Sequence, residues 1–381
     1  MKIRVEREVF AEAVAWTARS IPTRPGTLPQ LSGIKVSTDT DGLTLSGFDY
    51  ETSARVTLPA DISDEGQVLV SGRLLADIAR SLPNRPIDIA VDGAKLAVNC
   101  GSSRFSLQTM PVEDYPALPD MPEVAGSIDA DVFASAVSQA VTAAGRDDML
   151  PVLTGVKLEI QGANLALLAT DRFRLSLREL PWSPLQPDVT VTALVPARVL
   201  AETARSLPTG SSLDLALSTT GSGEGLIGFE SKASGGTRRT TTRLIEGAFP
   251  NVRQLFPSTS EISASVETSA LIDSVKRVSL VAGRNTPVRL AFTEGLVTLE
   301  AGNGEEAQAS ESLEATVSGG DISIGFNPTY LLDGLGVIDG SHVHISMTQP
   351  ARPAAFASLG APDETPSLDF RYLLMPLRMQ G

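Results

Sequence analysis

Apolar residues recur at helical spacing in a segment that the chain repeats. Residues 9–14 (VFAEAV) return as residues 132–137 (VFASAV) and, more faintly, as residues 270–275 (ALIDSV). In the first two copies the apolar positions are spaced i, i+3, i+4 and i+7, which is the buried stripe of an amphipathic helix. The pattern predicts that each of three repeated units opens with a helix.

A second repeated segment predicts another helix in every unit. Residues 73–83 (RLLADIARSLP) match residues 198–208 (RVLAETARSLP), and residues 329–335 (TYLLDGL) are a weaker third copy. The leucine and alanine positions again form one stripe, and the proline that ends each strong copy cannot continue a helix.

Short runs between these helices alternate apolar and polar residues, as half-buried strands do. They include residues 43–46, 165–168 and 297–300, and residues 54–59 and 174–181 follow the first two. Two helices with several strands in each unit predict an α+β fold in which helices cover mainly antiparallel sheet. Clusters of Pro, Gly and Ser place the domains at residues 1–121, 127–257 and 261–381.

Composition narrows the functional class. The 381 residues carry a formal net charge of −14 and a single cysteine, Cys100. So acidic a chain is not expected to coat DNA through many phosphate contacts, and one cysteine excludes a multi-cysteine metal site. The N-terminal residues contain no apolar signal core, and no apolar run is long enough for a membrane span, so we expect a cytoplasmic protein.

The polar faces of the second helices carry a repeated charge pattern. In the first copy it is Arg73, Asp77 and Arg80, and in the second it is Arg198, Glu202 and Arg205. These residues either pair within their own helices or form a basic surface on an acidic body. Further basic residues on or beside the other helices are Arg7, Arg19, Arg24, Arg146, Lys276 and Arg277. The third copy departs from the pattern, with Thr329, Asp333 and Gly336 at these places.

Motifs typical of enzymes have weak support. Residues 223–228 (GEGLIG) match a dinucleotide-binding pattern but lie between two strand-like runs, which predicts a hairpin loop. His342 and His344 share one strand face without a third metal ligand nearby in sequence. Asp171 is a candidate acid, yet Asp49 occupies the same place in the first unit, which favours a turn. We expect no cofactor and no metal.

Three segments carry a family resemblance. They are residues 169–175 (ATDRFRL), 246–252 (EGAFPNV) and 372–379 (YLLMPLRM). With the threefold repeat, they make the entire chain resemble bacterial DNA polymerase III β subunits, the sliding clamps. The resemblance implies a non-catalytic head-to-tail homodimer whose six domains form a ring around double-stranded DNA, without sequence preference. It also implies that the ring tethers the polymerase III α subunit, the clamp loader and other proteins with clamp-binding motifs.

The resemblance further implies a hydrophobic groove that binds the peptides of these partners. Its residues are Leu153, Thr170, Arg174, Leu175, Pro250, Leu255, Asn327, Tyr330, Leu373, Met375, Pro376, Leu377 and Arg378. A C-terminal segment rich in Leu and Met, with a proline, suits an adaptable peptide site, although a core edge strand is the alternative. The chain departs from many relatives at residues 150–152 and at residues 172–173, which bear on the shape of the groove.

Two more sets of residues follow from the resemblance. Facing the DNA we expect Arg24, Arg73, Arg80, Arg146, Arg198, Arg205, Lys276 and Arg277. In the dimer contact we expect Phe105 and Leu107 of one chain against Leu280 and Val281 of the other. Arg73 and Arg104 have Glu305, Glu306 and Glu311 as acidic partners for pairing across this contact.

Two other functions stay open at this point. One is a clamp paralogue that gives resistance to an inhibitor of the groove. The other is an enzyme that uses Asp171 and Arg174 in the cleft between domains.

Overall fold

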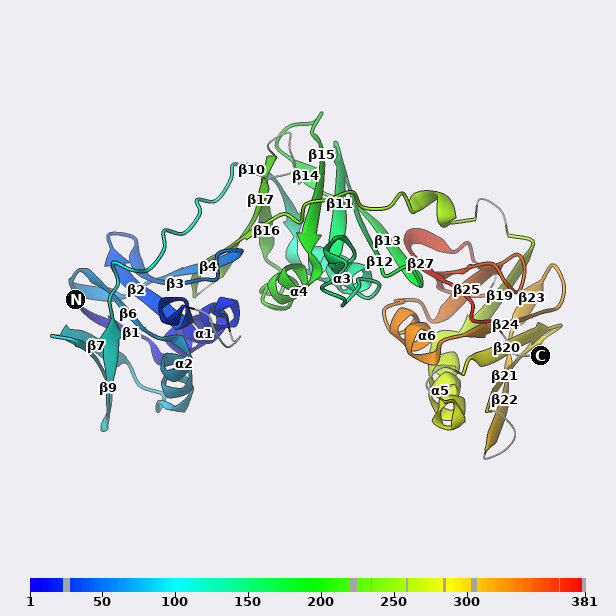
Figure 1. Ribbon diagram of the computed structural model, residues 1–381, viewed down its shortest axis with the longest axis horizontal. Helices are drawn as coiled ribbons and strands as arrows, with labels where there is room; N and C mark the ends of the chain where they lie inside the picture. Colours follow the sequence, from blue (N-terminus) through cyan, green and yellow to red (C-terminus); the bar gives the residue numbers. More distant parts are fainter. Residues whose placement is uncertain are drawn as a thin grey trace. The chain divides into compact units, whose positions relative to one another are not determined.

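A computed structural model describes residues 1–22, 28–219, 225–233, 235–257, 260–283, 286–302, 307–362 and 364–378 (Figure 1). Its contacts divide the chain into two compact units. Unit 1 comprises Met1–Phe133, Trp182–Pro187 and Glu202–Leu244. Unit 2 comprises Ala134–Pro181, Asp188–Ala201 and Ile245–Gly381. The central repeat therefore contributes elements to both units.

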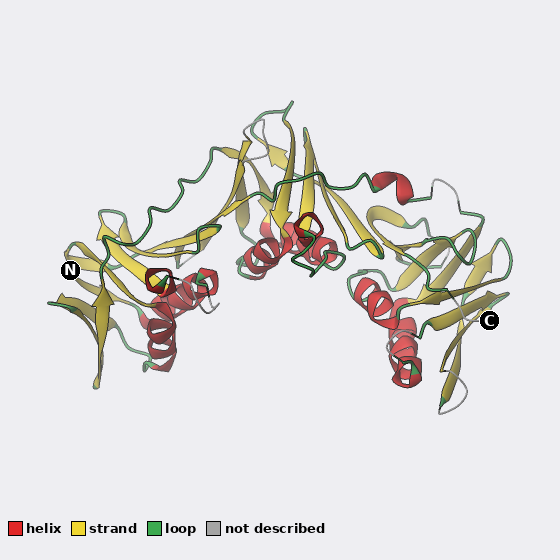
Figure 2. Ribbon diagram, in the orientation of Figure 1, coloured by secondary structure: helices red, strands yellow, loops and turns green. Residues whose placement is uncertain are grey.

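Every helix predicted from the repeated segments is present (Figure 2). The α-helices are α1 (Arg7–Thr17), α2 (Gly72–Ser81), α3 (Ala130–Val141), α4 (Ala197–Arg205), α5 (Thr268–Val278) and α6 (Pro328–Leu335). The apolar stripe decides which face of each helix is buried: in α1, Phe10 and Val14 are 1% and 0% exposed. Burying one such side chain contributes about 1.5 to 3 kcal/mol.

Unit 1 is built on a 14-stranded antiparallel sheet. In spatial order its strands are β14 (Ser183–Pro184), β10 (Val124–Asp129), β16 (Ser212–Thr219), β17 (Gly225–Ala233), β18 (Gly236–Arg243), β4 (Thr52–Leu58), β3 (Gly42–Phe48), β2 (Gly33–Asp39), β6 (Gly66–Ser71), β9 (Ser103–Met110), β8 (Lys95–Cys100), β7 (Ile87–Asp92), β1 (Lys2–Val5) and β5 (Asp61–Asp64). Helices α1 and α2 pack on each other and on strands of the first repeat, enclosing one core.

Unit 2 contains a 9-stranded and a 4-stranded sheet. The larger has the order β15 (Thr190–Pro196), β11 (Gly155–Gln161), β12 (Asn164–Thr170), β13 (Arg174–Pro181), β27 (Ser367–Leu374), β26 (Ala354–Leu359), β25 (His342–Met347), β19 (Ile262–Glu267) and β23 (Thr316–Ser318). The smaller has the order β22 (Gln308–Glu314), β21 (Leu296–Gly302), β20 (Val288–Thr293) and β24 (Ile322–Phe326).

Successive repeats join through pairs of strands that occupy equivalent positions in the repeats. In unit 1, β4 of the first repeat pairs with β18 of the second, with Ser53 opposite Thr241. In unit 2, β13 of the second repeat pairs with β27 of the third, with Leu175 opposite Leu373. Each junction thus adds the last strand of one repeat to the middle hairpin of the preceding repeat, which removes two exposed strand edges.

The hairpin interpretation of residues 223–228 is consistent with the strands around them. Strands β16 and β17 are antiparallel neighbours, with Leu217 opposite Ile227. Gly223 and Glu224 lie outside the described residues. A strand followed by a strand lacks the helix that a dinucleotide-binding turn requires. Within the part of the chain that the structure describes, no helix combines the length and the apolar character that crossing a membrane requires.

Candidate functional site

A cleft of about 590 Å³ opens in unit 2 beside the turn between β12 and β13. Its lining comes from the segment after α3, from that turn and from α6. The lining residues are Ala144, Gly145, Arg146, Asp147, Leu150, Leu153, Asp171, Arg172, Phe173, Arg174, Thr329, Tyr330 and Asp333.

The turn is organised by the carboxylate of Asp171. Its Oδ1 accepts the backbone N–H groups of Phe173 and Arg174, both at 3.0 Å. The hydroxyl of Thr170 donates to the carbonyl of Arg174 at 2.7 Å and closes the turn from the other side. Such an Asx turn tolerates a left-handed residue, and Arg172 has a φ of +79°. The turn role predicted for Asp171 is therefore confirmed, and it presents Phe173 with 50% of its surface exposed.

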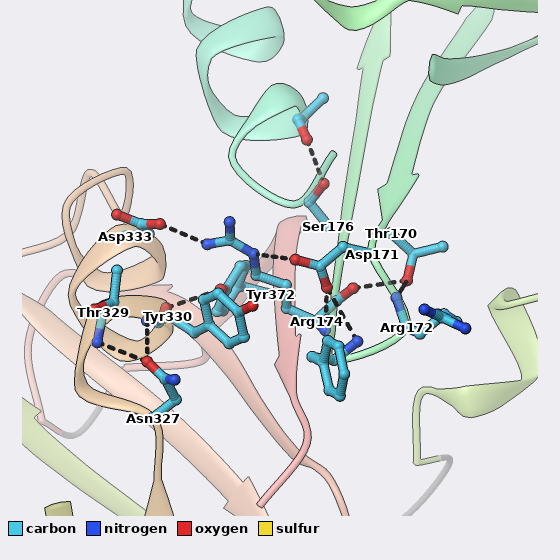
Figure 3. A network of polar contacts seen from close by, with 12 residues as sticks. Thr170, Asp171, Arg172, Arg174, Ser176, Asn327, Thr329, Tyr330, Asp333 and Tyr372 are labelled. Carbon is cyan, nitrogen blue, oxygen red and sulfur yellow. Dashed lines mark hydrogen bonds and ion pairs between the residues drawn. The ribbon is translucent and has the colours of Figure 1, made fainter. Parts of the chain in front are cut away.

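Arg174 is the central cation of the cleft (Figure 3). It is only 5% exposed, its Nε donates to Asp171 Oδ2 at 2.9 Å, and its Nη1 donates to Asp333 Oδ2 at 2.6 Å. Its guanidinium carbon lies 4.4 Å from the ring centroid of Tyr330. Burial opposes the charged form, but the bonds to Asp333 and Asp171 raise the pKa of Arg174 above its ordinary value. The guanidinium is therefore charged and held by two carboxylates.

Two aromatic rings form one wall of the cleft. Phe173 and Tyr330 stack with centroids 6.2 Å apart and an interplanar angle of 27°. Asn327 caps α6 by accepting the N–H groups of Thr329 and Tyr330, and Tyr372 donates its hydroxyl to the carbonyl of Tyr330 at 2.8 Å (Figure 3). Burial raises the pKa of Tyr372, so this hydroxyl keeps its proton. These contacts place Tyr330 independently of any ligand.

An apolar cluster lies behind the turn. Leu175 and Leu373, each 1% exposed, pack with Val252 and with the half-buried Phe249 and Phe256. The C-terminal segment continues past this cluster, because the N–H of Met375 donates to the carbonyl of Phe173 at 2.8 Å. Met375 remains 38% exposed and Leu255 48% exposed. The cluster is thus a buried apolar core, and the segments that flank it carry exposed apolar side chains.

The groove residues expected from the sequence occupy different environments. Leu153, Arg174 and Tyr330 line the cleft, whereas Thr170 closes the turn and Asn327 caps α6. Leu175 and Leu373 are buried in the apolar cluster. The exposed members are Pro250, Leu255, Met375 and Arg378, and the half-buried ones beside them are Pro376 and Leu377.

Sequence reasoning did not include several lining residues in the groove. It noted Phe173 only as a departure from the family pattern, and it gave Asp333 no part in the cleft. Arg146, which we expected to face DNA, lies in the cleft lining. The helical spacing of Tyr330 and Asp333 offered a signal, because residues at i and i+3 share one face of a helix.

The expected DNA-facing residues are exposed wherever the structure describes them. The exposed members are Arg73, Arg80, Arg146, Arg198, Arg205, Lys276 and Arg277, and Arg24 lies outside the described residues. Pairing within helices also occurs. Arg80 lies 3.9 Å from Asp77, and Lys276 lies 3.7 Å from Asp273. Arg277 instead bonds both oxygens of Glu311 on β22.

The residues expected in the dimer contact divide by exposure. Leu280 is 85% exposed and Phe105 36% exposed, and Val281 is half-buried. Leu107 is only 2% exposed because it faces inward from β9 into the core of unit 1, so it offers little surface to another chain. Glu305 and Glu306 lie outside the described residues.

In the described part of the chain, no group of three His, Cys, Asp or Glu side chains gathers in a way that suits a metal ion. His342 and His344 are half-buried on β25, and burial lowers the pKa of His344. Both histidines are therefore strand residues without a ligand set among the described residues.

Comparison with known proteins assigns the chain to a protein family. Residues 1–119, 127–251 and 253–378 match the N-terminal, central and C-terminal domain models of the DNA polymerase III beta subunit. The chain is 54% identical to the Beta sliding clamp of Streptomyces coelicolor over 381 residues, covering 100% of both chains. It is 44% identical to the Beta sliding clamp homolog GriR of Streptomyces muensis, covering 99% of both.

A solved structure agrees with these matches. The DnaN sliding clamp of Pseudomonas aeruginosa bound to griselimycin is 27% identical, covers 100% of both chains and superposes with a TM-score of 0.89. The three consecutive domain matches explain the threefold repeat of helices and strands. The chain therefore belongs to the DNA polymerase III beta subunit family, the bacterial sliding clamps.

Proposed function

We propose that two copies of this chain close head to tail into a ring around double-stranded DNA and tether replication proteins through the cleft of unit 2. Members of this family are non-catalytic processivity factors, so the chain acts by holding its partners on DNA. The proposal rests on the strand junction that joins successive repeats. Among the described residues, the equivalent strands at the two ends of the series, β22 and residues 103–108 of β9, lack such a partner strand.

The two internal junctions predict the contact that closes the ring. The middle hairpins of the three repeats end in β4, β13 and β22, and the last hairpins end in β18, β27 and β9. Strand β22 is the edge of its sheet, and residues 103–108 of β9 pair only with β8 among the described residues. Adding β9 of one copy to β22 of another repeats the internal junction and removes both edges.

Exposed side chains support this contact. Leu280 follows α5, and Phe105 lies on β9, and both expose apolar surface. Arg104 is exposed next to Phe105, and Glu311 lies on β22. Apolar groups surrounded by opposite charges are typical of subunit interfaces.

Sedimentation tests the ring directly. We expect the wild-type chain to sediment with twice the 40.0 kDa mass of one chain. The Leu280→Asp variant should sediment as a folded monomer, because it places a carboxylate in the apolar contact. A monomeric wild-type chain, or a dimeric Leu280→Asp variant, would contradict the strand-junction arrangement.

A topological hold on DNA reconciles a net charge of −14 with a DNA partner. A closed ring needs no tight phosphate binding, which would slow its movement along the duplex. The exposed arginines and lysine of the helices supply local positive charge on an acidic body, and such contacts read no base sequence. We place this activity in the cytoplasm.

Retention on circular DNA tests the encirclement. Protein loaded by a clamp loader should stay on a nicked plasmid in high salt and leave when the plasmid is cut once. Screened charges do not release a closed ring, whereas a protein held by ion pairs dissociates. Equal retention on circular and linear DNA would contradict the proposal.

We propose the cleft and its apolar surroundings as the binding site for partner peptides. The partners are the polymerase III α subunit, the clamp loader and other proteins with a clamp-binding motif. The stacked pair Phe173 and Tyr330, with Met375 and Leu255 exposed nearby, supplies aromatic and adaptable apolar contacts. Calorimetry with a synthetic peptide of the α subunit's clamp-binding sequence tests this, and no measurable binding would contradict it.

The other two functions have less support. The chain is 54% identical over its full length to a protein named Beta sliding clamp, from Streptomyces coelicolor, which favours a processivity clamp over a resistance paralogue. An enzyme based on Asp171 is disfavoured because both carboxylate oxygens accept hydrogen bonds, from the turn and from Arg174.

A further inference from the structure

We infer that Asp333 is a positioning residue for peptide binding, which acts by holding the guanidinium of Arg174 against the ring of Tyr330. The inference rests on the proposed peptide-binding function of the cleft. It concerns a residue on α6 that reaches the turn of the central repeat, 159 positions away in sequence.

The geometry makes Asp333 the second of two anchors. Arg174 Nη1 lies 2.6 Å from Asp333 Oδ2, and Arg174 Nε lies 2.9 Å from Asp171 Oδ2 (Figure 3). Asp171 has little capacity left for a second bond to Arg174, because its Oδ1 accepts two backbone N–H groups of the turn and its Oδ2 already accepts the Nε–H. Two anchors on different nitrogens fix the plane of the guanidinium more firmly than the single bond to Asp171 would.

The fixed plane matters because Tyr330 stacks on it. The ring of Tyr330 has the Arg174 guanidinium at 4.4 Å and also stacks with Phe173, whose centroid lies 6.2 Å away. Arg174, Tyr330 and Phe173 all line the cleft. When Asp333 loses its charge, the buried guanidinium loses an acceptor and turns toward other oxygens, and the aromatic wall loses its support.

The helix that carries Asp333 has other attachments. Tyr372 donates to the carbonyl of Tyr330, and the side chain of Asn327 caps the first turn of α6. Leu331 and Leu335 are buried on the same helix. Asp333 itself is partly exposed, at 38% of its side chain, so its replacement leaves the packing of α6 in place.

The experiment measures affinity for the synthetic α-subunit peptide in the full-length protein. Asp333→Asn, which keeps the shape and removes the charge, is expected to weaken binding about tenfold. Asp333→Glu retains a carboxylate and should stay within about threefold of the wild type. Asp369→Asn is the matched control, because Asp369 pairs with Arg178 at 4.0 Å while 72% exposed. We expect that control to bind as the wild type does.

A double-mutant cycle separates positioning from general destabilisation. Once Arg174→Gln has removed the guanidinium, adding Asp333→Asn should cause no further loss of affinity. Additive losses would overturn the inference, and so would equal losses in the Asn and Glu variants or unchanged binding by Asp333→Asn. If the Asn variant does not fold, Asp333→Ser takes its place with the same expectations. A wild-type chain that fails to bind the peptide would instead overturn the proposed function.

Discussion

Tyr50 and Arg172 occupy the same left-handed position in successive repeats, with φ angles of +74° and +79°. Each follows an aspartate whose Oδ1 accepts two backbone N–H groups: Asp49 those of Glu51 and Thr52, and Asp171 those of Phe173 and Arg174. The repeat therefore preserves a strained turn that a glycine would adopt freely.

Relief of this strain gives a stability prediction. Arg172→Gly should raise the free energy of unfolding by about 0.5 to 1 kcal/mol, because the left-handed conformation costs a residue with a Cβ more than glycine loses in chain entropy. Arg172→Ala is the control, since it removes the same side chain and keeps the Cβ. Urea unfolding of the three proteins measures the effect. Equal stability of the Gly and Ala variants would show that the turn is unstrained.

The two apolar parts of the groove should respond differently to truncation. Met375→Ala should weaken the peptide by about 1 to 3 kcal/mol with little change in stability, because Met375 is 38% exposed. Leu175→Ala should instead destabilise the fold by about 2 to 5 kcal/mol, because Leu175 is buried in the cluster with Leu373. Calorimetry and thermal unfolding on both variants separate the effects. Unchanged affinity for Met375→Ala would remove Met375 from the site.

Acidic partners on the helices should regulate movement on DNA. Asp77 and Asp273 lie 3.9 and 3.7 Å from Arg80 and Lys276, in exposed pairs that contribute little to stability. Neutralising both with Asn frees the two cations for phosphates, so we expect stronger salt dependence and slower diffusion along stretched DNA.

The control for that prediction removes an acid from a strand. Asp88 pairs with Arg4 at 3.5 Å between β7 and β1, so Asp88→Asn changes the net charge without touching a helix. Its diffusion should equal that of the wild type. If Asp88→Asn slows diffusion as much as the helix variants do, net charge and not local pairing determines the rate.

Arg253 forms ion pairs with Glu159 on β11 and Glu179 on β13, and this charged network should make stability sensitive to acid. Burial opposes ionisation of Glu159, but hydrogen bonds from Lys157 and Arg253 lower its pKa below the ordinary 4.5. A lowered folded pKa contributes stability above the unfolded pKa, and this is lost as the pH falls through the folded value.

The expected loss therefore begins near pH 4.5 and grows as the pH decreases. In Glu159→Gln the decrease in melting temperature between pH 7 and pH 4 should be smaller than in the wild type, because the titrating group is absent. Glu294→Gln, at an exposed position between β20 and β21, is the control. A wild-type decrease no larger than that of Glu159→Gln would contradict the assignment.

The local pattern of apolar and polar residues was sufficient to predict the helices and strands and their threefold repetition. The i, i+3, i+4 spacing around Phe10 and Phe133 led to α1 and α3, and the alternation from residue 174 to 181 led to β13. The turn role of Asp171 also followed from its repeat partner Asp49. These features depend on the geometry of neighbouring residues, which the sequence displays directly. The domain limits predicted from Pro and Gly clusters stay predictions.

Burial and long-range partners were decided only by the tertiary structure. Leu107 and Leu175 are apolar and were expected in contact sites. Each is at most 2% exposed, because its strand directs the side chain toward a core. Arg174 can bond to Asp333 only because β13 pairs with β27 and α6 packs against β27. The sequence by itself determined three repeated α+β domains and their family. Which side chains meet in the cleft depended on strand register and helix packing between residues far apart in the chain, for which local periodicity carries no information.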